Sequence, residues 1–557
     1  MQFNGSIAKA AIIIASLAVV AGCSDGGSST TPPPPAPPSP PPPPPPPPTS
    51  SSVTVSGIVT YEFVPPNASN VGLDYDATQI LPSRGVVVQA LDASNQVIAS
   101  DVTDENGAYE VSVPSNTNVR IQARAELLES TAGTWDIDVV DNTNSNAIYV
   151  LQGSLTSSGA ANSTRNLFAP SGWGGTSYTA PRTAAPFAIL DAIYDAVIAI
   201  NTVEPGTVFP DLQIFWSPLN RAADGNVADG EIGTSSFTFI GGIPTILILG
   251  DENSDTDEYD RSVVIHEFGH YTENALGRSD SIGGSHSLDD LLDPRVAWSE
   301  GYSNAFASII DNDPIYRDSG GNQQQGGFFF SVEANSRVFA TEGWFSEFSV
   351  QSIVYDIFDS NSDGADTISA GFAPIYQSLT GDAFTTNPNP TTIFSFINAL
   401  RTVPGIDVGA IDVLLNDQNI NGTGADGAGE TNSGGVSNAL PVFPVESVGG
   451  AALEICSIDD EGTFNALGNR RLVRVSIPTT QNYTISMTRT SGPSGRDPDF
   501  QIFRLGDFIN QGISAVPDSE TLSANLPAGE YFFDAYDFLN INADGPSGDV
   551  CFDFSVQ

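Results

Sequence analysis

A proline tract between residues 31 and 49 sets the first limit on how this chain can fold. Proline lacks a backbone N–H and holds φ near one value, so an almost pure proline run joins neither a helix nor a sheet. Such a run favours an extended polyproline spacer. The tract therefore indicates a linker at residues 23–50. This linker separates a predicted leader at residues 1–22 from a folded body that begins at residue 51.

The length of the chain predicts more than one domain in this body. The chain has 557 residues, and single hydrophobic cores stop growing near roughly 250–300 residues. Its 66 acidic and 19 basic residues give a formal net charge of −47. Because this charge repels phosphate backbones, we expect no nucleic-acid partner. The composition leaves the oligomeric state open.

The leader has the features of an export signal. Lys9 precedes an apolar stretch from Ala10 to Val20, and small residues follow. The run Val20–Cys23 resembles the lipobox of bacterial lipoproteins, and this resemblance implies that Cys23 is lipidated after cleavage. Ser24 replaces the aspartate associated with inner-membrane retention, which favours a lipid anchor in the outer membrane of the bacterial envelope. The alternative is an ordinary signal peptide and a secreted protein.

The two remaining cysteines are expected to form a disulfide. Cys456 and Cys551 belong to an exported chain, where disulfides persist. They bracket a run of short β-rich segments within residues 441–557, which resembles the pre-peptidase C-terminal sandwich of secreted peptidases. A second all-β sandwich is expected at residues 51–151, where Thr103–Tyr109 resembles the turn and strand of carboxypeptidase regulatory-like domains. Such domains are accessory modules without catalytic residues.

The chemistry of the chain is concentrated in one short motif, His266-Glu267-Phe268-Gly269-His270. On a helix, His266 and His270 project from one face about one turn apart, as two imidazoles that grip one Zn²⁺ must do. Glu267 lies one position round and can reach water held there. All three histidines of the chain fall within 21 positions. The alternative is a buried helix with fortuitous histidines.

A third zinc ligand is expected from the next helix. Asp293 and Pro294 suit the start of that helix, which carries Glu300. Across residues 234–304 the chain resembles a gluzincin of the thermolysin and fungalysin type, and this implies an α+β zincin-type catalytic domain, at residues 165–440, with Glu300 as ligand. Asn304 stands where that family commonly has an acidic residue that orients a ligand histidine. The alternative for Glu300 is a surface carboxylate.

The resemblance implies metal-assisted hydrolysis of peptide bonds. Zinc would lower the pKa of water and polarise the scissile carbonyl, and Glu267 would take the proton. His286 is the first candidate for an oxyanion donor and Tyr302 follows, although His286 could equally be structural or bind a substrate carboxylate. The strand Thr245–Leu249 is expected to be a sheet edge to which a polypeptide substrate adds.

A weaker signal concerns calcium. Asp359, Asn361 and Asp363 alternate before a glycine, as in the first half of a calcium loop. Position 12 is Ala370, so the usual bidentate glutamate is missing. A plain turn is the alternative to a Ca²⁺ site.

Together these patterns predict a multidomain protein in which a zincin-type domain is flanked by two all-β sandwiches. The expected function is zinc-dependent endopeptidase activity by a lipid-anchored surface protein. One alternative is a non-catalytic adhesin or matrix-binding lipoprotein that keeps a peptidase fold. Another is a zinc hydrolase that acts on a non-peptide amide.

Overall fold

A computed structural model describes residues 51–131, 133–333, 341–361, 364, 366–459, 464–542 and 548–557. The predicted signal peptide, Cys23 and the linker at residues 23–50 lie outside these ranges. Residues 51–557 form one compact unit.

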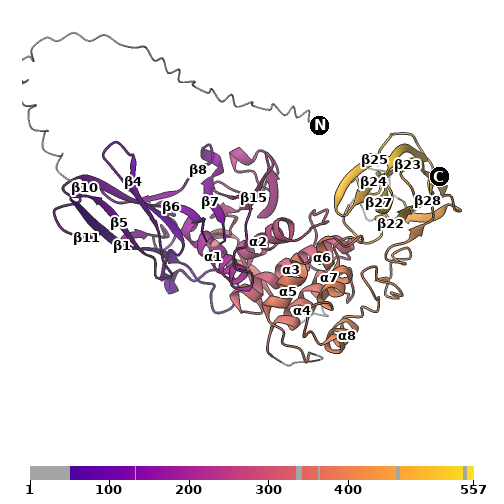
Figure 1. Ribbon diagram of the computed structural model, residues 1–557, viewed down its shortest axis with the longest axis horizontal. Helices are drawn as coiled ribbons and strands as arrows, with labels where there is room; N and C mark the ends of the chain where they lie inside the picture. Colours follow the sequence, from indigo (N-terminus) through magenta and orange to yellow (C-terminus); the bar gives the residue numbers. More distant parts are fainter. Residues whose placement is uncertain are drawn as a thin grey trace, which may run out of the picture. The chain divides into compact units, whose positions relative to one another are not determined.

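The first part of the unit is β-rich, as the sequence predicts (Figure 1). One sheet is built around the long strand β1, which pairs with β2, β5, β11 and β12. Buried residues of β1, β3, β5 and β6 belong to one apolar core. The strands are β1 (Ser52–Phe63), β2 (Gln79–Pro82), β3 (Val86–Leu91), β4 (Val97–Val102), β5 (Ala108–Pro114), β6 (Asn118–Glu129), β7 (Trp135–Asp141), β8 (Ala147–Ile148), β9 (Val150–Gln152), β10 (Thr156–Ser157), β11 (Ser163–Thr164) and β12 (Leu167–Ala169).

A second sheet combines strands from before and after residue 151, where the sequence predicts the end of the first sandwich. Its main path is β14-β15-β13-β7-β6-β3-β4. β13 (Leu212–Trp216) pairs in parallel with both β7 and β15 (Ile243–Ile248), and β14 (Ser236–Ile240) lies at the edge. The helix α1 (Ala185–Val203) contacts β6, β7 and α2. This helix is long and apolar enough to cross a membrane, but most of that stretch is buried inside the protein.

The helical part comes after the hairpin β14–β15 in the sequence. Contacts link α2 to α3 and α3 to α4, and the hairpin β18–β19 comes after α3. The elements are the strands β16 (Gly250–Asp251), β17 (Asp255–Thr256), β18 (Ile315–Gly320) and β19 (Gly326–Ser331), and the helices α2 (Arg261–Leu276), α3 (Pro294–Asp311), α4 (Glu347–Phe358), α5 (Phe372–Thr380), α6 (Asp382–Thr385), α7 (Ile393–Leu400) and α8 (Val408–Asp417).

The last part of the unit is β-rich with an apolar core of its own, as expected for residues 441–557. One sheet has the order β20-β22-β27-β24-β25 and the other β21-β28-β23-β26. Cys456 on β21 and Cys551 on β28 face each other and form a disulfide. The strands are β20 (Val445–Glu446), β21 (Leu453–Ser457), β22 (Arg470–Ile477), β23 (Gln481–Ser491), β24 (Pro498–Arg504), β25 (Asp507–Gly512), β26 (Ser519–Leu526), β27 (Gly529–Asp537) and β28 (Val550–Val556).

Candidate metal centre

Helix α2 carries both histidines and the glutamate of the motif on a buried segment. The apolar residues around the motif, Val264, Ile265 and Phe268, are at most 1% exposed. Gly269 lets the next helix approach closely, because a Cβ there would lie 3.0 Å from Ser303 Oγ and 3.1 Å from its Cα on α3. The two helices are therefore closely packed behind the motif. This contact brings α3, and with it Glu300, to the two histidines.

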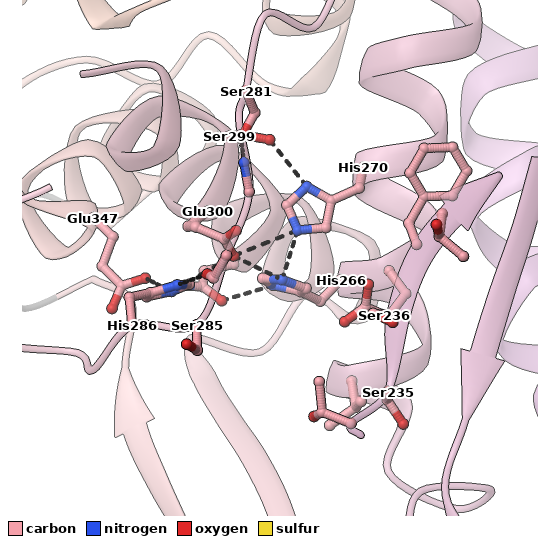
Figure 2. Close-up of a pocket in the computed structure, with 18 of the residues that line it drawn as sticks. Ser235, Ser236, His266, His270, Ser281, Ser285, His286, Ser299, Glu300 and Glu347 are labelled. Atoms are coloured by element: carbon pink, nitrogen blue, oxygen red, sulfur yellow. Dashed lines mark hydrogen bonds and ion pairs between the residues drawn. The ribbon is translucent and has the colours of Figure 1, made fainter. Parts of the chain in front are cut away.

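Three side-chain atoms converge at one point of the cleft (Figure 2). The Nε2 atoms of His266 and His270 are 3.0 Å apart. Glu300 Oε2 lies 3.3 Å from the first and 3.4 Å from the second. A tetrahedral metal with ligand bonds of roughly 2.0–2.1 Å has ligand–ligand edges of about 3.3–3.4 Å. The three atoms therefore fit one face of a tetrahedral zinc shell.

The other ring nitrogens are held by hydrogen bonds that set the tautomers. His266 Nδ1 lies 2.8 Å from Asn304 Oδ1, while the Asn304 amide donates to Gln351. His270 Nδ1 lies 3.0 Å from Ser299 Oγ. With both protons on Nδ1, the two Nε2 lone pairs point at each other. That arrangement is repulsive unless a proton or a metal ion lies between them, so the chemistry of the donor set is compatible with a metal.

Glu273 extends this network and was missed by sequence reasoning. Its two carboxylate oxygens accept hydrogen bonds from Ser299 Oγ at 2.6 Å and Trp298 Nε1 at 2.8 Å. Glu273 is fully buried, and burial raises its pKa to about 7. Its position three residues after His270 on the same helix was the available signal, because residues at this spacing share a face.

The charge of Glu300 is balanced by the histidines. Burial alone would raise the Glu300 pKa, but His270 and His266 hold it well below its usual range. Burial likewise lowers the His270 pKa, but the Glu300 carboxylate outweighs this and raises it to about 9. Glu300 thus carries negative charge and His270 the compensating positive charge, at the point where a zinc ion would supply it.

Glu267 lies beside this point in a cleft of about 860 Å³. Its side chain is buried, and burial raises the pKa of its carboxyl group despite the nearby histidines. The cleft is lined on one side by residues of the edge strand β14 and on another by β18 and β19. Glu267 can therefore reach a molecule held between the metal position and the edge strand.

His286 is also brought to the cleft. Its Nδ1 lies 3.0 Å from the carbonyl oxygen of Gly284, and its Nε2 lies 3.5 Å from Glu347 Oε2 and 3.9 Å from Glu300 Oε2. Burial lowers the His286 pKa, but the hydrogen bond to Glu347 outweighs this and raises it to about 10. Glu347, the first residue of α4, was not predicted, since it lies 61 positions further along the chain.

The prediction for Tyr302 is corrected by its surroundings. Its ring is 1% exposed and stacks on Trp298 and Phe306 in the core, and it is not among the residues that line the cleft. Glu300 and Tyr302 are two positions apart on a helix, so their side chains cannot share a face. Among the residues that the structure describes, Tyr316 is the tyrosine that lines the cleft, with its ring centre 6.0 Å from that of His266.

The calcium loop expected at Asp359, Asn361 and Asp363 stays a prediction. Asp359 follows the last residue of α4 and is buried. Asp363 lies outside the described residues, so the loop cannot be assembled from them.

Removal of the Asn304 side chain tests the hydrogen bond to His266. Asn304→Ala should weaken zinc binding about 10–100-fold, because outer partners of ligand histidines fix ring orientation and tautomer. Competition with a chromogenic zinc chelator measures the affinity. Ser308→Ala, one turn further along α3 and also buried, is the control and should leave the affinity unchanged. Equal affinities for all three chains would contradict the role of Asn304.

A comparison with protein families identifies a peptidase-related segment that contains this site. A family model described as the mycolysin C-terminal domain matches residues 250–413. This range includes α2, α3 and α4 with His266, His270 and Glu300, and covers less than half of the chain. No curated protein sequence matches the chain.

Two of the solved structures that match resemble parts of this chain at low sequence identity. The pre-peptidase C-terminal domain of a Bacillus anthracis collagenase is 13% identical, with 21% of this chain and 94% of that chain covered and a TM-score of 0.16. The precursor of protealysin, a metalloproteinase from Serratia proteamaculans, is 10% identical, with 52% and 88% covered and a TM-score of 0.30.

Proposed function

We propose that this protein is a zinc-dependent endopeptidase that acts on extracellular polypeptides. The observation that carries the proposal is the convergence of His266 Nε2, His270 Nε2 and Glu300 Oε2 at distances of 3.0–3.4 Å, with Glu267 beside them in an open cleft. Three protein ligands and a position open to the cleft are what a catalytic zinc site requires, whereas a structural zinc site is closed by a fourth protein ligand.

The roles of the side chains follow from their positions. Bound zinc would polarise the scissile carbonyl and make the attacking water acidic. Glu267 would accept the proton of that water and pass it to the leaving amine. His286, whose Nε2 faces the same space from the opposite wall, is our candidate donor for the developing oxyanion. Asn304 and Ser299 keep the two ligand rings in orientation.

The substrate class rests on the edge of the second sheet. Within the described residues, β14 pairs with β15 alone, and its residues 236–239 line the cleft. The expectation that Thr245–Leu249 forms the edge is wrong, because β15 lies between β13 and β14. An extended polypeptide can add to the free side of β14 as another strand. This favours polypeptides over small amides as substrates.

The proposed location is the bacterial envelope, with a lipid on Cys23 as anchor and the proline-rich linker as spacer. The lipobox-like run Val20–Cys23 and the proline tract support this location. A secreted form without the lipid is the alternative, and mass analysis of the N-terminal peptide distinguishes the two.

Metal removal tests the proposed function. The purified chain should contain close to one zinc ion and cleave casein; a chelator should abolish the cleavage, and added Zn²⁺ should restore it. Without the metal, its three protein ligands cannot polarise the scissile carbonyl or activate the attacking water. A chain that binds zinc without cleaving casein or any member of a peptide library would instead favour the adhesin, or an amide hydrolase if a small amide is cleaved.

A further inference from the structure

Three aspartates meet on the wall of the cleft, away from the zinc ligands. Asp255 lies on β17 before α2, Asp257 follows it, and Asp318 lies on β18 after α3. One carboxylate oxygen of each lies within 4.8 Å of the others. All three residues line the cleft that holds His266 and Glu267. The proposed peptidase chemistry gives them no role.

Contacts between two loops hold these aspartates in place. The Gly321 N–H donates to the Ser254 carbonyl at 2.7 Å, and the Gln323 N–H donates to the Glu252 carbonyl at 2.9 Å. The Thr256 N–H donates to Gln324 Oε1 at 3.2 Å. The loop that ends β18 is thus joined to the hairpin β16–β17. These bonds bring the backbone segments that carry the three carboxylates next to each other.

The most buried of the three has an oxygen without a partner. Asp257 is 2% exposed; Ser235 donates to its Oδ2, while its Oδ1 is buried with no hydrogen bond. Asp255 Oδ1 is buried and unpartnered as well. In the described part of the chain, no arginine or histidine forms an ion pair with any of the three aspartates. A buried carboxylate oxygen without a donor is costly unless a cation or a proton compensates it.

The electrostatics of the group agree with a missing positive charge. Burial, then Asp318 and Asp255, raise the pKa of Asp257 well above its usual value. Burial and Asp255 raise the pKa of Asp318 to about 7. The neighbouring Asp260 adds to this repulsion, although Ser319 donates to its carboxylate. Without a cation, the group would have to take up protons near neutral pH.

We propose that Asp255, Asp257 and Asp318 form a Ca²⁺ site that fastens the hairpin β18–β19 to the segment before α2. Ca²⁺ takes oxygen ligands at about 2.3–2.6 Å, so ligand oxygens of one shell lie at most about 5 Å apart. The observed spacing is within this limit. Three carboxylates without nitrogen or sulfur donors suit a hard cation and not zinc. Water from the cleft would complete the shell.

The test is calcium titration of the full-length chain by calorimetry, after EDTA treatment and restoration of zinc. We expect one Ca²⁺ per chain, and Asp257→Asn or Asp318→Asn should weaken its binding at least about tenfold. The control is Asp138→Asn, in the acidic group Glu126, Asp136 and Asp138, where Arg124 pairs with Glu126. It should bind Ca²⁺ as the wild type does.

Thermal unfolding separates loss of the site from loss of the fold. Without Ca²⁺, Asp257→Asn should melt at a higher temperature than the wild type, because it removes a repelling charge. Added Ca²⁺ should raise the melting temperature of the wild type and leave that of Asp257→Asn unchanged. The proposal is overturned if the wild type binds no Ca²⁺, or if both asparagine variants bind it as tightly as the wild type. Neither measurement depends on peptidase activity. Failure of the Ca²⁺ proposal can therefore be distinguished from failure of the proposed function, on which it does not rest.

Discussion

Replacement of Glu267 by glutamine is expected to lower peptide cleavage about 10²–10⁴-fold, the usual contribution of a positioned general base. The zinc content should stay at the wild-type level, because the ligand atoms belong to His266, His270 and Glu300. Glutamine keeps the size of the side chain and removes its ability to take a proton. Initial rates on a fluorogenic peptide, measured beside zinc analysis of the same samples, give both quantities.

The matched control for this variant is Tyr302→Phe. Tyr302 was the other candidate from the sequence, but its hydroxyl lies in the core and not in the cleft. Its loss should therefore change the cleavage rate less than about tenfold, through packing alone. A Glu267→Gln chain that cleaves as fast as the wild type would refute the general-base role. A large loss of rate in Tyr302→Phe alone would show that the hydroxyl reaches the reaction.

The sequence pointed to the three residues that we propose as zinc ligands more completely than to the residues around them. His266, Glu267 and His270 lie within a single helix, where fixed periodicity relates sequence spacing to direction. Glu300 was predicted from the resemblance to gluzincins, and the helix that carries it begins at the expected cap, Asp293, which the structure confirms. A local signal is available wherever a site is built on one regular element.

Residues contributed by distant segments had no such signal. Glu347 starts α4 and meets His286 only after α3 and α4 have packed. Asp318 meets Asp257 across two hairpins whose pairing depends on loop hydrogen bonds. The sheet edge was misplaced for a related reason. β15 is the most apolar strand of its hairpin, but the parallel pairing with β13 that makes it internal cannot be seen in its own residues.

The cleft holds two groups of residues that could bind a metal ion, and Glu300 belongs to both while Glu347 belongs to one. Glu300 Oε2 lies 3.3 Å from His266 Nε2, but it also lies 3.9 Å from His286 Nε2, which in turn faces Glu347. Both groups bring three ligand atoms together. The first is the tighter, with distances near those of a zinc shell. It also holds both ligand rings by their Nδ1 atoms, whereas Nδ1 of His286 contacts a carbonyl within its own loop.

Glutamine variants of these two glutamates therefore give different expected results. Glu300→Gln should weaken zinc binding by more than about 100-fold, since the loss of a charged ligand exceeds the 10–100-fold effect of an outer partner. Glu347→Gln should keep its zinc, because that carboxylate belongs to the second group alone. Chelator competition measures both affinities. Equal loss of zinc in the two variants would show that the ion binds between His286 and Glu347. That result would contradict the proposed site at His266 and His270.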